Sequence, residues 1–367
     1  KILFSENPGI IIQIKDLKSA SKILKENNID FLKIGSITND RTLNIKHQNY
    51  HSSLNINHLR DLWFKTSYLF DRKQCGEDHA LERYKKYKET ELKFKFPAHF
   101  TGKASQYQID LNRRKPSGIK AAIIREKGVN GDREMAYIMY LAGLDVKDVH
   151  MTDLISGRET LEDLNLIVFV GGFSNSDVLG SAKGWAGAFL YNEKAKKALD
   201  NFYDRQDTLS LGVCNGCQLM MELNLVYPEH EQRAKMLHNG SGKFEAGFIN
   251  VDILKNDSVM LKTLAGSRLG IHVAHGEGKF QFPYSEDKYK ITSKYSYNSY
   301  PANPNDSEYA AAAICSVDGR HLVMMPHLER AFMPWHWPEY PQDRKSDEIT
   351  PWVEAFVNAR EWIKNKA

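Results

Sequence analysis

The sequence predicts an α/β protein in which residues 118–367 form a doubly wound, mostly parallel sheet, preceded by a small α+β region. From Ile119 onward, short apolar runs alternate with longer amphipathic segments, the pattern of parallel strands joined by crossover helices. The apolar run 166–170 ends in Gly171-Gly172, and the run 208–213 ends at Cys214. Ligands of such sheets bind at the carboxyl ends of the strands, so both endings indicate a site.

Composition narrows the class of protein further. The 367 residues are 42% apolar and 26% charged with a net charge of +4, which predicts about two or three globular domains and excludes a disordered chain. No stretch approaches the roughly 18–20 apolar residues of a membrane span, so we expect no membrane partner. A charge this small gives little support for nucleic-acid binding. Four cysteines are too few for a disulfide framework, and without a visible signal peptide we expect a cytoplasmic protein.

The first elements read as strand, helix, strand and helix. Residues 10–14 and 31–34 are extended and apolar, while residues 15–25 and 59–74 carry apolar side chains at helical spacing. The chain begins at Lys1 rather than at a methionine, and we expect residues 1–75 to be the end of a larger domain in a longer polypeptide. The polar stretch 76–117 is interpreted as a solvated connector, with a surface for an acidic partner as the alternative.

The region after residue 118 follows a regular order. Strands are predicted at 119–124, 146–149, 166–170, 208–213 and 321–325. Helices are predicted at 131–141, 185–203 and 216–223. Beyond Lys243 the strands are expected to be more antiparallel.

Cys214 lies where an apolar strand meets a helix, flanked by Gly212 and Gly216. A nucleophile at such a junction occupies a sharp turn, which favours glycine two residues to either side. The helix N-terminus favours a thiolate and offers free N–H groups, including that of Asn215, to a developing oxyanion. The spacing Cys214-x-x-Cys217 is also a redox spacing, and a buried, inert cysteine is the other alternative, favoured for Cys217.

A cysteine nucleophile needs a base and a group that orients it. His327-Leu328-Glu329 is a candidate for both, because in a chain that stays extended residues two apart point to the same side; a surface position for the pair is the alternative. Gly171-Gly172-Phe173 allows close backbone approach to a ligand, although an ordinary turn would have the same sequence. His272, His275 and Glu277 have metal-ligand chemistry, but the glycines between them favour a loop, so no metal site is predicted. Residues 240–244 invite comparison with a phosphate loop, but Leu237 stands in place of its first glycine and Phe244 in place of its Ser/Thr.

Together these motifs resemble a class I (triad) glutamine amidotransferase, a flavodoxin-like fold. More narrowly, they resemble the C-terminal part of the large-form phosphoribosylformylglycinamidine synthase family. The resemblance is carried by residues 125–135, 171–174, 177–180, 184–186, 212–218, 275–278, 318–320 and 324–330, and more loosely by Leu3-Phe4-Ser5-Glu6 and 59–63.

The resemblance implies roles for individual residues. Cys214 would be the nucleophile, His327 the general base and acid, and Glu329 the carboxylate that orients it. The N–H groups of Asn215 and of the Gly172-Phe173 turn would form the oxyanion hole. Gln218 and the turn at Gly171-Gly172 would hold the substrate, glutamine.

The resemblance also implies a ligase reaction in purine biosynthesis. Ammonia released from glutamine would pass to a synthetase portion of the same polypeptide, where ATP and magnesium activate formylglycinamide ribonucleotide. No cofactor is expected in the present residues. Two positions depart from the family: Leu328 replaces a proline, and Gly247 replaces an arginine. They are the support for an alternative, an inactive glutaminase-like scaffold; the other alternative is a thiol redox protein.

Overall fold

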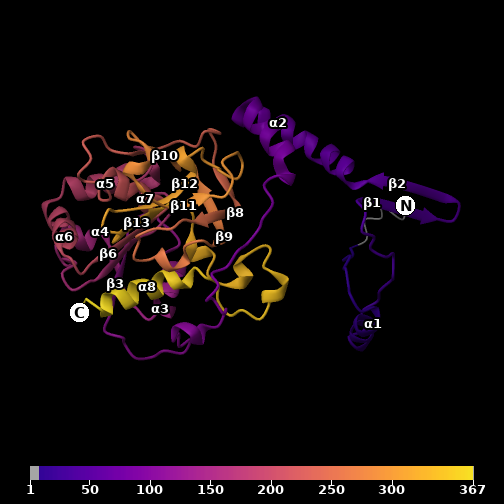
Figure 1. The fold of residues 1–367 in the computed structure, drawn as a ribbon, viewed down its shortest axis with the longest axis horizontal. Coiled ribbons are helices and arrows are strands. Elements are labelled where there is room, and N and C mark those ends of the chain that lie inside the picture. Colours follow the sequence, from indigo (N-terminus) through magenta and orange to yellow (C-terminus); the bar gives the residue numbers. More distant parts are fainter. Residues whose placement is uncertain (1–7, 367) are drawn as a thin grey trace. The chain divides into compact units, whose positions relative to one another are not determined.

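The first part of the chain contains one helix and one hairpin. The computed structural model describes residues 8–366 and divides into two compact units, Lys1–Trp63 and Phe64–Ala367 (Figure 1). In the first unit, helix α1 (Leu17–Glu26) begins where Asp16 accepts hydrogen bonds from the N–H groups of Lys18 and Ser19. Strands β1 (Thr42–His47) and β2 (Tyr50–Asn55) pair antiparallel. The predicted helix 15–25 is therefore confirmed.

Two predicted strands in this unit are wrong. Residues 10–14 and 31–34 form no strand, and Ile10 and Leu32 are 91% and 88% exposed. Apolar, β-branched composition is insufficient for a strand, because a strand also needs a partner for its backbone hydrogen bonds. The pairing occurs instead at β1 and β2, whose sequences are more polar. The family motif at Leu3-Phe4-Ser5-Glu6 lies outside the described residues.

Helix α2 (Ile56–Lys85) includes the predicted helix 59–74 and continues beyond it through a break at Gly76, where φ is 82°. The boundary between the two units falls within this helix. The following segment, predicted as a connector, contributes Phe100, Ala104, Tyr107 and Ile109 to the hydrophobic core of the second unit. These apolar residues are widely spaced along a polar stretch, so no periodic pattern predicts that they are buried.

A single nine-stranded sheet organises the second unit. Its order is β4-β3-β5-β6-β13-β12-β11-β8-β9. The first five strands are parallel: β4 (Asp145–His150), β3 (Lys120–Arg125), β5 (Leu166–Phe169), β6 (Leu209–Val213) and β13 (His321–Met324). The other four extend the sheet antiparallel: β12 (Ala311–Cys315), β11 (Lys290–Tyr295), β8 (Glu245–Ile253) and β9 (Arg268–His275). A separate pair joins β7 (Lys235–Leu237) to β10 (Lys279–Gln281).

Helices cover both faces of this sheet, which confirms the doubly wound α/β class. Helix α3 (Asp132–Leu141) packs beside α8 (Val353–Lys364). Helices α4 (Met151–Ser156), α5 (Lys183–Leu190), α6 (Glu193–Asp204) and α7 (Asn215–Glu222) form the second group, and the two groups are separated in Figure 1. Every residue of β5 is 0% exposed, as expected for a central strand covered on both faces.

The long helix predicted at 185–203 is in fact two helices, α5 and α6. The first ends before Tyr191, and the second begins where Asn192 accepts a hydrogen bond from the N–H of Ala195 at 2.9 Å. An asparagine whose side chain caps a helix favours this break over continuous helix.

Candidate active site

The predicted site residues converge at the carboxyl ends of three neighbouring strands. Gly171-Gly172 follows β5, Cys214 follows β6 and His327 follows β13. These strands are adjacent in the order β5-β6-β13. The sheet topology therefore gathers residues that are up to 156 positions apart in the sequence (171 to 327).

Cys214 occupies the sharp turn between β6 and α7, with φ 53° and ψ −107°. Its N–H donates to the Met324 carbonyl of the strand β13 region at 2.9 Å, which fixes the turn to the sheet. Its thiol lies 3.6 Å from the Ala274 carbonyl oxygen. A non-glycine residue held in this region of φ is strained, and such strain is concentrated at functional sites.

His327 and Glu329 form a buried pair. Nδ1 of His327 lies 2.6 Å from Oε1 of Glu329, and both side chains are 1% exposed. His327 itself has an extended backbone, but a short 3₁₀ turn, Leu328–Arg330, begins directly after it. The sequence argument from a continuous extended chain is therefore wrong, although the contact it predicted is present. Leu328 is fully buried.

The charge state of His327 is set by three opposing effects. Burial disfavours the imidazolium, but the Glu329 carboxylate and the Cys214 sulfur together raise the pKa of His327 to about 9. Since Nδ1 is bound to Glu329, Nε2 is the nitrogen available to Cys214. This arrangement keeps His327 protonated near neutral pH, with its second ring nitrogen left for Cys214.

Gly171 leaves the space in which Cys214 and His327 meet. A Cβ atom at Gly171 would lie 2.8 Å from Cε1 of His327 and 3.3 Å from Cβ of Cys214. A Cβ at Gly172, where φ is 120°, would lie 2.5 Å from Cα of Val129. Both glycines are thus required by close approach to other protein atoms; the close approach to a ligand that the sequence predicted for this turn stays a prediction.

The turn after β5 is fastened to the segment that follows β3. Residues Val129 and Gly172 form an antiparallel bridge in which the Phe173 N–H donates to the Gly128 carbonyl at 2.9 Å. The Asn130 N–H also donates to the Gly171 carbonyl at 2.8 Å, and in this bridge pattern the N–H of Gly172 is directed away from Val129. The free donor of this turn is therefore on Gly172, whereas the N–H of Phe173 is already used.

Asn215 and Gln218 connect the nucleophile helix to two loops. The Asn215 side chain accepts from the N–H of Ser174 at 3.1 Å and donates to Oε1 of Gln218 at 2.9 Å. Gln218 in turn donates to the Glu277 carbonyl at 2.7 Å. Gln218 also supplies the first N–H bonded within α7, to the Cys214 carbonyl, so the N–H of Asn215 is one of the free donors at the helix N-terminus.

A cavity of about 140 Å³ lies one turn along α7 from Cys214. Its charged and amide-bearing lining consists of Lys183, Gln218, Glu222 and Glu277. Of the binding residues that the sequence predicted, Gln218 is the one that lines this cavity. Glu277 was visible as part of the motif His275-Gly276-Glu277-Gly278 but was considered only as a metal ligand, and nothing local marked Lys183.

The groups considered for a metal serve other contacts. His272 lies 2.9 Å from the His336 carbonyl, and Nδ1 of His275 lies 3.3 Å from Oδ1 of Asn239. Within residues 8–366, no three histidine, cysteine or acidic side chains lie close enough to bind a metal ion. Over the same residues, no helix is both long and apolar enough to cross a membrane.

Cys217 differs sharply from Cys214, although both are free thiols. It is fully buried, and burial, reinforced by the nearby Cys214, raises the pKa of Cys217 well above the usual thiol value. A thiol that resists ionisation is a poor nucleophile in disulfide exchange.

Residues 118–363 match the family model of the CobB/CobQ-like glutamine amidotransferase domain. The chain is 38% identical over 395 residues to the probable phosphoribosylformylglycinamidine synthase, chloroplastic/mitochondrial, of Arabidopsis thaliana, covering 99% of this chain and 27% of that protein. It is 36% identical over 400 residues to the phosphoribosylformylglycinamidine synthase of Homo sapiens, covering 98% and 29%.

A solved structure shows the same fold. The structure of PurLQS from Thermotoga maritima contains a chain with a TM-score of 0.51 and 22% identity, matched over 69% of this chain and 99% of that chain. The present chain spans less than a third of the length of the two synthases named above. Since the family model covers about two thirds of its residues, the chain belongs to the CobB/CobQ-like glutamine amidotransferase family.

Proposed function

We propose that residues 118–367 hydrolyse glutamine with Cys214 as nucleophile, His327 as general base and acid, and Glu329 as the carboxylate that orients and charges His327. The observation that carries the proposal is the buried His327–Glu329 pair, 2.6 Å apart, beside a cysteine held in a strained turn at a helix N-terminus. The family membership supplies the substrate class.

The first step is attack of the Cys214 thiolate on the side-chain carbonyl carbon of glutamine. A C–S bond forms, and the carbonyl π electrons move to oxygen. The N–H groups of Asn215, the first residue of α7, and of Gly172 would stabilise this oxyanion. We assign the second donor to Gly172 because the Phe173 N–H is held by Gly128.

The second step is loss of ammonia. Nε2–H of His327 gives its proton to the amide nitrogen, the C–N bond breaks, and a thioester remains on Cys214. Neutral His327 then removes a proton from water, which attacks the thioester and releases glutamate and the thiolate. Glu329 stabilises the imidazolium at each stage at which His327 holds the extra proton.

The α-amino acid end of glutamine would occupy the cavity beside Gln218. One turn of helix rises about 5.4 Å, which suits the length of a glutamine side chain extending from Cys214 toward that cavity. Lys183 there is suited to the α-carboxylate, and Glu277 to the α-ammonium group.

For the whole polypeptide we propose the reaction named for its curated relatives, phosphoribosylformylglycinamidine synthesis in purine biosynthesis. The ammonia would be delivered to a synthetase portion that uses ATP and magnesium to aminate formylglycinamide ribonucleotide. The partner of this domain would then be that synthetase portion, represented here by residues 1–75, with 76–117 as the connector. Four free thiols favour a reducing compartment such as the cytoplasm.

Two rival functions have less support. A redox role for Cys214 and Cys217 requires Cys217 to ionise, which its burial opposes. A scaffold role rested on Leu328 and Gly247. Leu328 is packed within the core beside an intact His327–Glu329 contact. At Gly247 on β8, a Cβ would have no atom within 4 Å, so this departure leaves the triad unchanged.

The proposal is tested by mass spectrometry after treatment of the chain with an electrophilic glutamine analogue. We expect a single adduct on Cys214 that excess glutamine prevents, and no adduct in Cys214→Ala. The same substitution should abolish ammonia release from glutamine. An analogue that labels another residue, or labels Cys214 without protection by glutamine, would overturn the assignment.

A further inference from the structure

We infer that the second half of α2, residues 64–85, positions the glutamine-binding residues of the proposed glutaminase through its ion pairs with the loop 239–245. This inference rests on the proposed function, because it concerns how tightly that site holds glutamine. Asp71 and Arg83 are the positioning residues. Neither is within the triad, and both belong to the same compact unit as the site.

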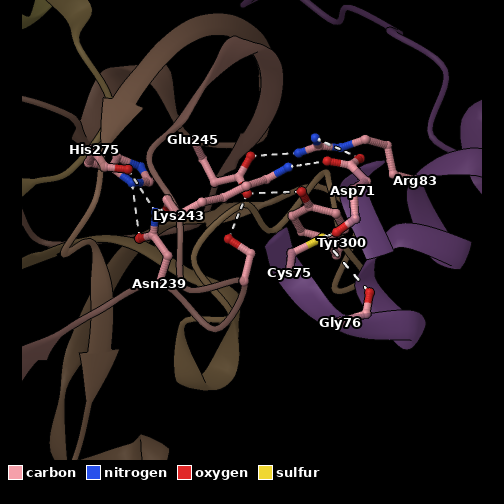
Figure 2. A network of polar contacts seen from close by, with 10 residues as sticks. Asp71, Cys75, Gly76, Arg83, Asn239, Lys243, Glu245, His275 and Tyr300 are labelled. Carbon is pink, nitrogen blue, oxygen red and sulfur yellow. Dashed lines mark hydrogen bonds and ion pairs between the residues drawn. The ribbon is translucent and has the colours of Figure 1, made fainter. Parts of the chain in front are cut away.

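The contact between α2 and the loop is built from charged side chains (Figure 2). Lys243 donates to Oδ1 of Asp71 at 2.6 Å, and Arg83 donates to Oε2 of Glu245 at 2.6 Å. Arg83 also donates to Oδ2 of Asp71 at 3.2 Å. The guanidinium lies 4.7 Å from the ring centre of Tyr300, so a planar cation is better suited here than a point charge.

Because these ion pairs are partly buried, breaking them costs more free energy than breaking a surface ion pair. Glu245 is only 5% exposed, and its other oxygen accepts from the hydroxyls of Ser241 at 2.6 Å and Tyr300 at 2.9 Å. A buried carboxylate must keep its partners, because leaving it unpaired is costly. Loss of Arg83 would therefore oblige the loop carrying Glu245 to rearrange.

The loop 239–245 is joined to the loop 275–278 through Asn239, whose backbone N–H donates to the Gly276 carbonyl at 2.9 Å. Asn239 donates from Nδ2 to the carbonyls of Lys243 at 2.9 Å and His275 at 2.7 Å. Its Oδ1 accepts from the N–H of Gly278 at 3.0 Å. Figure 2 shows Asn239 and His275 joined on one side of the loop and α2 on the other.

The loop 275–278 reaches the proposed substrate site directly. The Glu277 carbonyl accepts the hydrogen bond from Gln218, and the Glu277 side chain lines the cavity. The triad stands on other elements, the ends of β6 and β13. Disturbing the α2 contact should therefore weaken the hold on glutamine while leaving the reactivity of Cys214 nearly unchanged.

The experiment compares two alkylating agents on the full chain and on Arg83→Met. Iodoacetamide lacks an α-amino acid group and reports the intrinsic reactivity of Cys214, whereas the electrophilic glutamine analogue also requires the substrate site. We expect Arg83→Met to react about tenfold more slowly with the analogue below saturation, the factor for one weakened hydrogen bond. Its iodoacetamide rate should change less than about twofold, and KM for glutamine should rise with kcat nearly constant.

Matched variants separate positioning from general stability. Arg83→Lys should recover part of the analogue rate, because it restores the charge without the planar contact. Arg268→Met is the control: Arg268 pairs with Asp252 at 2.7 Å at the opposite end of β8 and β9, and its side chain is 31% exposed against 34% for Arg83. The control should leave the analogue rate unchanged.

The outcomes are distinct. Unaltered analogue kinetics in Arg83→Met would overturn the inference while leaving the proposed function intact. Equal losses with both reagents, accompanied by a lower melting temperature, would show a purely structural contact and overturn it as well. Failure of the analogue to label Cys214 in the unsubstituted chain would refute the proposed function, and this inference with it.

Discussion

Replacing Glu329 by glutamine tests whether its carboxylate keeps His327 charged beside Cys214. The amide has nearly the size of the carboxylate but no charge. Burial lowers the pKa of His327, and the charges and hydrogen bonds of Glu329 and Cys214 raise it to about 9, so removing the Glu329 charge should bring that pKa down. Because Glu329 and His327 are each 1% exposed, solvent cannot compensate for the lost charge.

The size of the effect follows from the contact that is lost. A hydrogen bond to a charged group contributes about 1.5–3 kcal/mol. At about 1.4 kcal/mol per factor of ten, Glu329→Gln should lose about 10- to 150-fold in kcat/KM for glutamine near pH 8. The alkaline limb of the pH–rate profile, which reports loss of the imidazolium proton, should move to lower pH.

The same pair makes stability depend on pH with a definite sign. The folded-state pKa of His327 exceeds the ordinary value of 6.5. The folded chain therefore retains the proton that the unfolded chain loses. The contribution to the free energy of unfolding is full below pH 6.5 and disappears as the pH rises through about 9.

The assay is the rate of glutamine hydrolysis, together with labelling of Cys214 by the glutamine analogue, measured between pH 6 and 10. Glu354→Gln is the matched control, since Glu354 is 3% exposed and pairs with His99 at 2.9 Å. The control should leave the profile unchanged. An alkaline limb at the same pH in Glu329→Gln, with kcat/KM within threefold of the unsubstituted chain, would refute the reasoning.

Three further predictions concern the surroundings of the triad. Gly171→Ala should lower kcat by about 100-fold, because its methyl group displaces His327, whereas Gly247→Ala, which meets no atom within 4 Å, should leave glutamine hydrolysis unchanged. Cys217→Ala should retain most of the hydrolysis while lowering the free energy of unfolding by about 1 kcal/mol, and complete loss of activity would favour the redox alternative. Burial, aided by His327, lowers the pKa of His275 to about 3. Below pH 6.5 the unfolded chain therefore binds a proton that the folded chain does not, so stability decreases as the pH decreases. Urea unfolding between pH 4 and 7 should show a shallower fall, by up to about 1.4 kcal/mol per pH unit, in His275→Gln; an unchanged slope would contradict this assignment.

The positions of the central parallel strands were predictable because their segments are short, mostly apolar and bounded by clear breaks. β5 and β6 are buried along their whole length, whereas the edge strand β4 is largely polar. The failures in the first unit have the opposite cause. Residues 10–14 are apolar but have no ladder, and β1 and β2 form a ladder without being apolar, since the pairing partner is not encoded in either segment alone.

The residues of the candidate site also fall into those that a local sequence pattern predicts and those that it does not. Cys214 and the turn at Gly171-Gly172 are visible because backbone geometry restricts the residues that fit there. Glu277 and Lys183 are not, since one lies on a loop and the other at the first residue of α5, and both positions depend on distant contacts. The charged contact between α2 and the loop 239–245 joins residues more than 150 positions apart, such as Arg83 and Glu245, and neither has a local pattern.

The glycines around Cys214 are explained by close packing of the backbone, independently of any catalytic role of the thiol. A Cβ at Gly212 would lie 2.5 Å from the Gly216 carbonyl oxygen, and one at Gly216 would lie 2.0 Å from the Phe169 carbonyl oxygen. Both glycines would be required by this turn whatever residue stood at position 214. The pattern Gly-x-Cys-x-Gly therefore establishes the turn, while the proposed catalysis depends on the thiol, His327 and Glu329. For that reason the decisive substitutions are Cys214→Ala and Glu329→Gln, which change the chemistry and leave the turn intact.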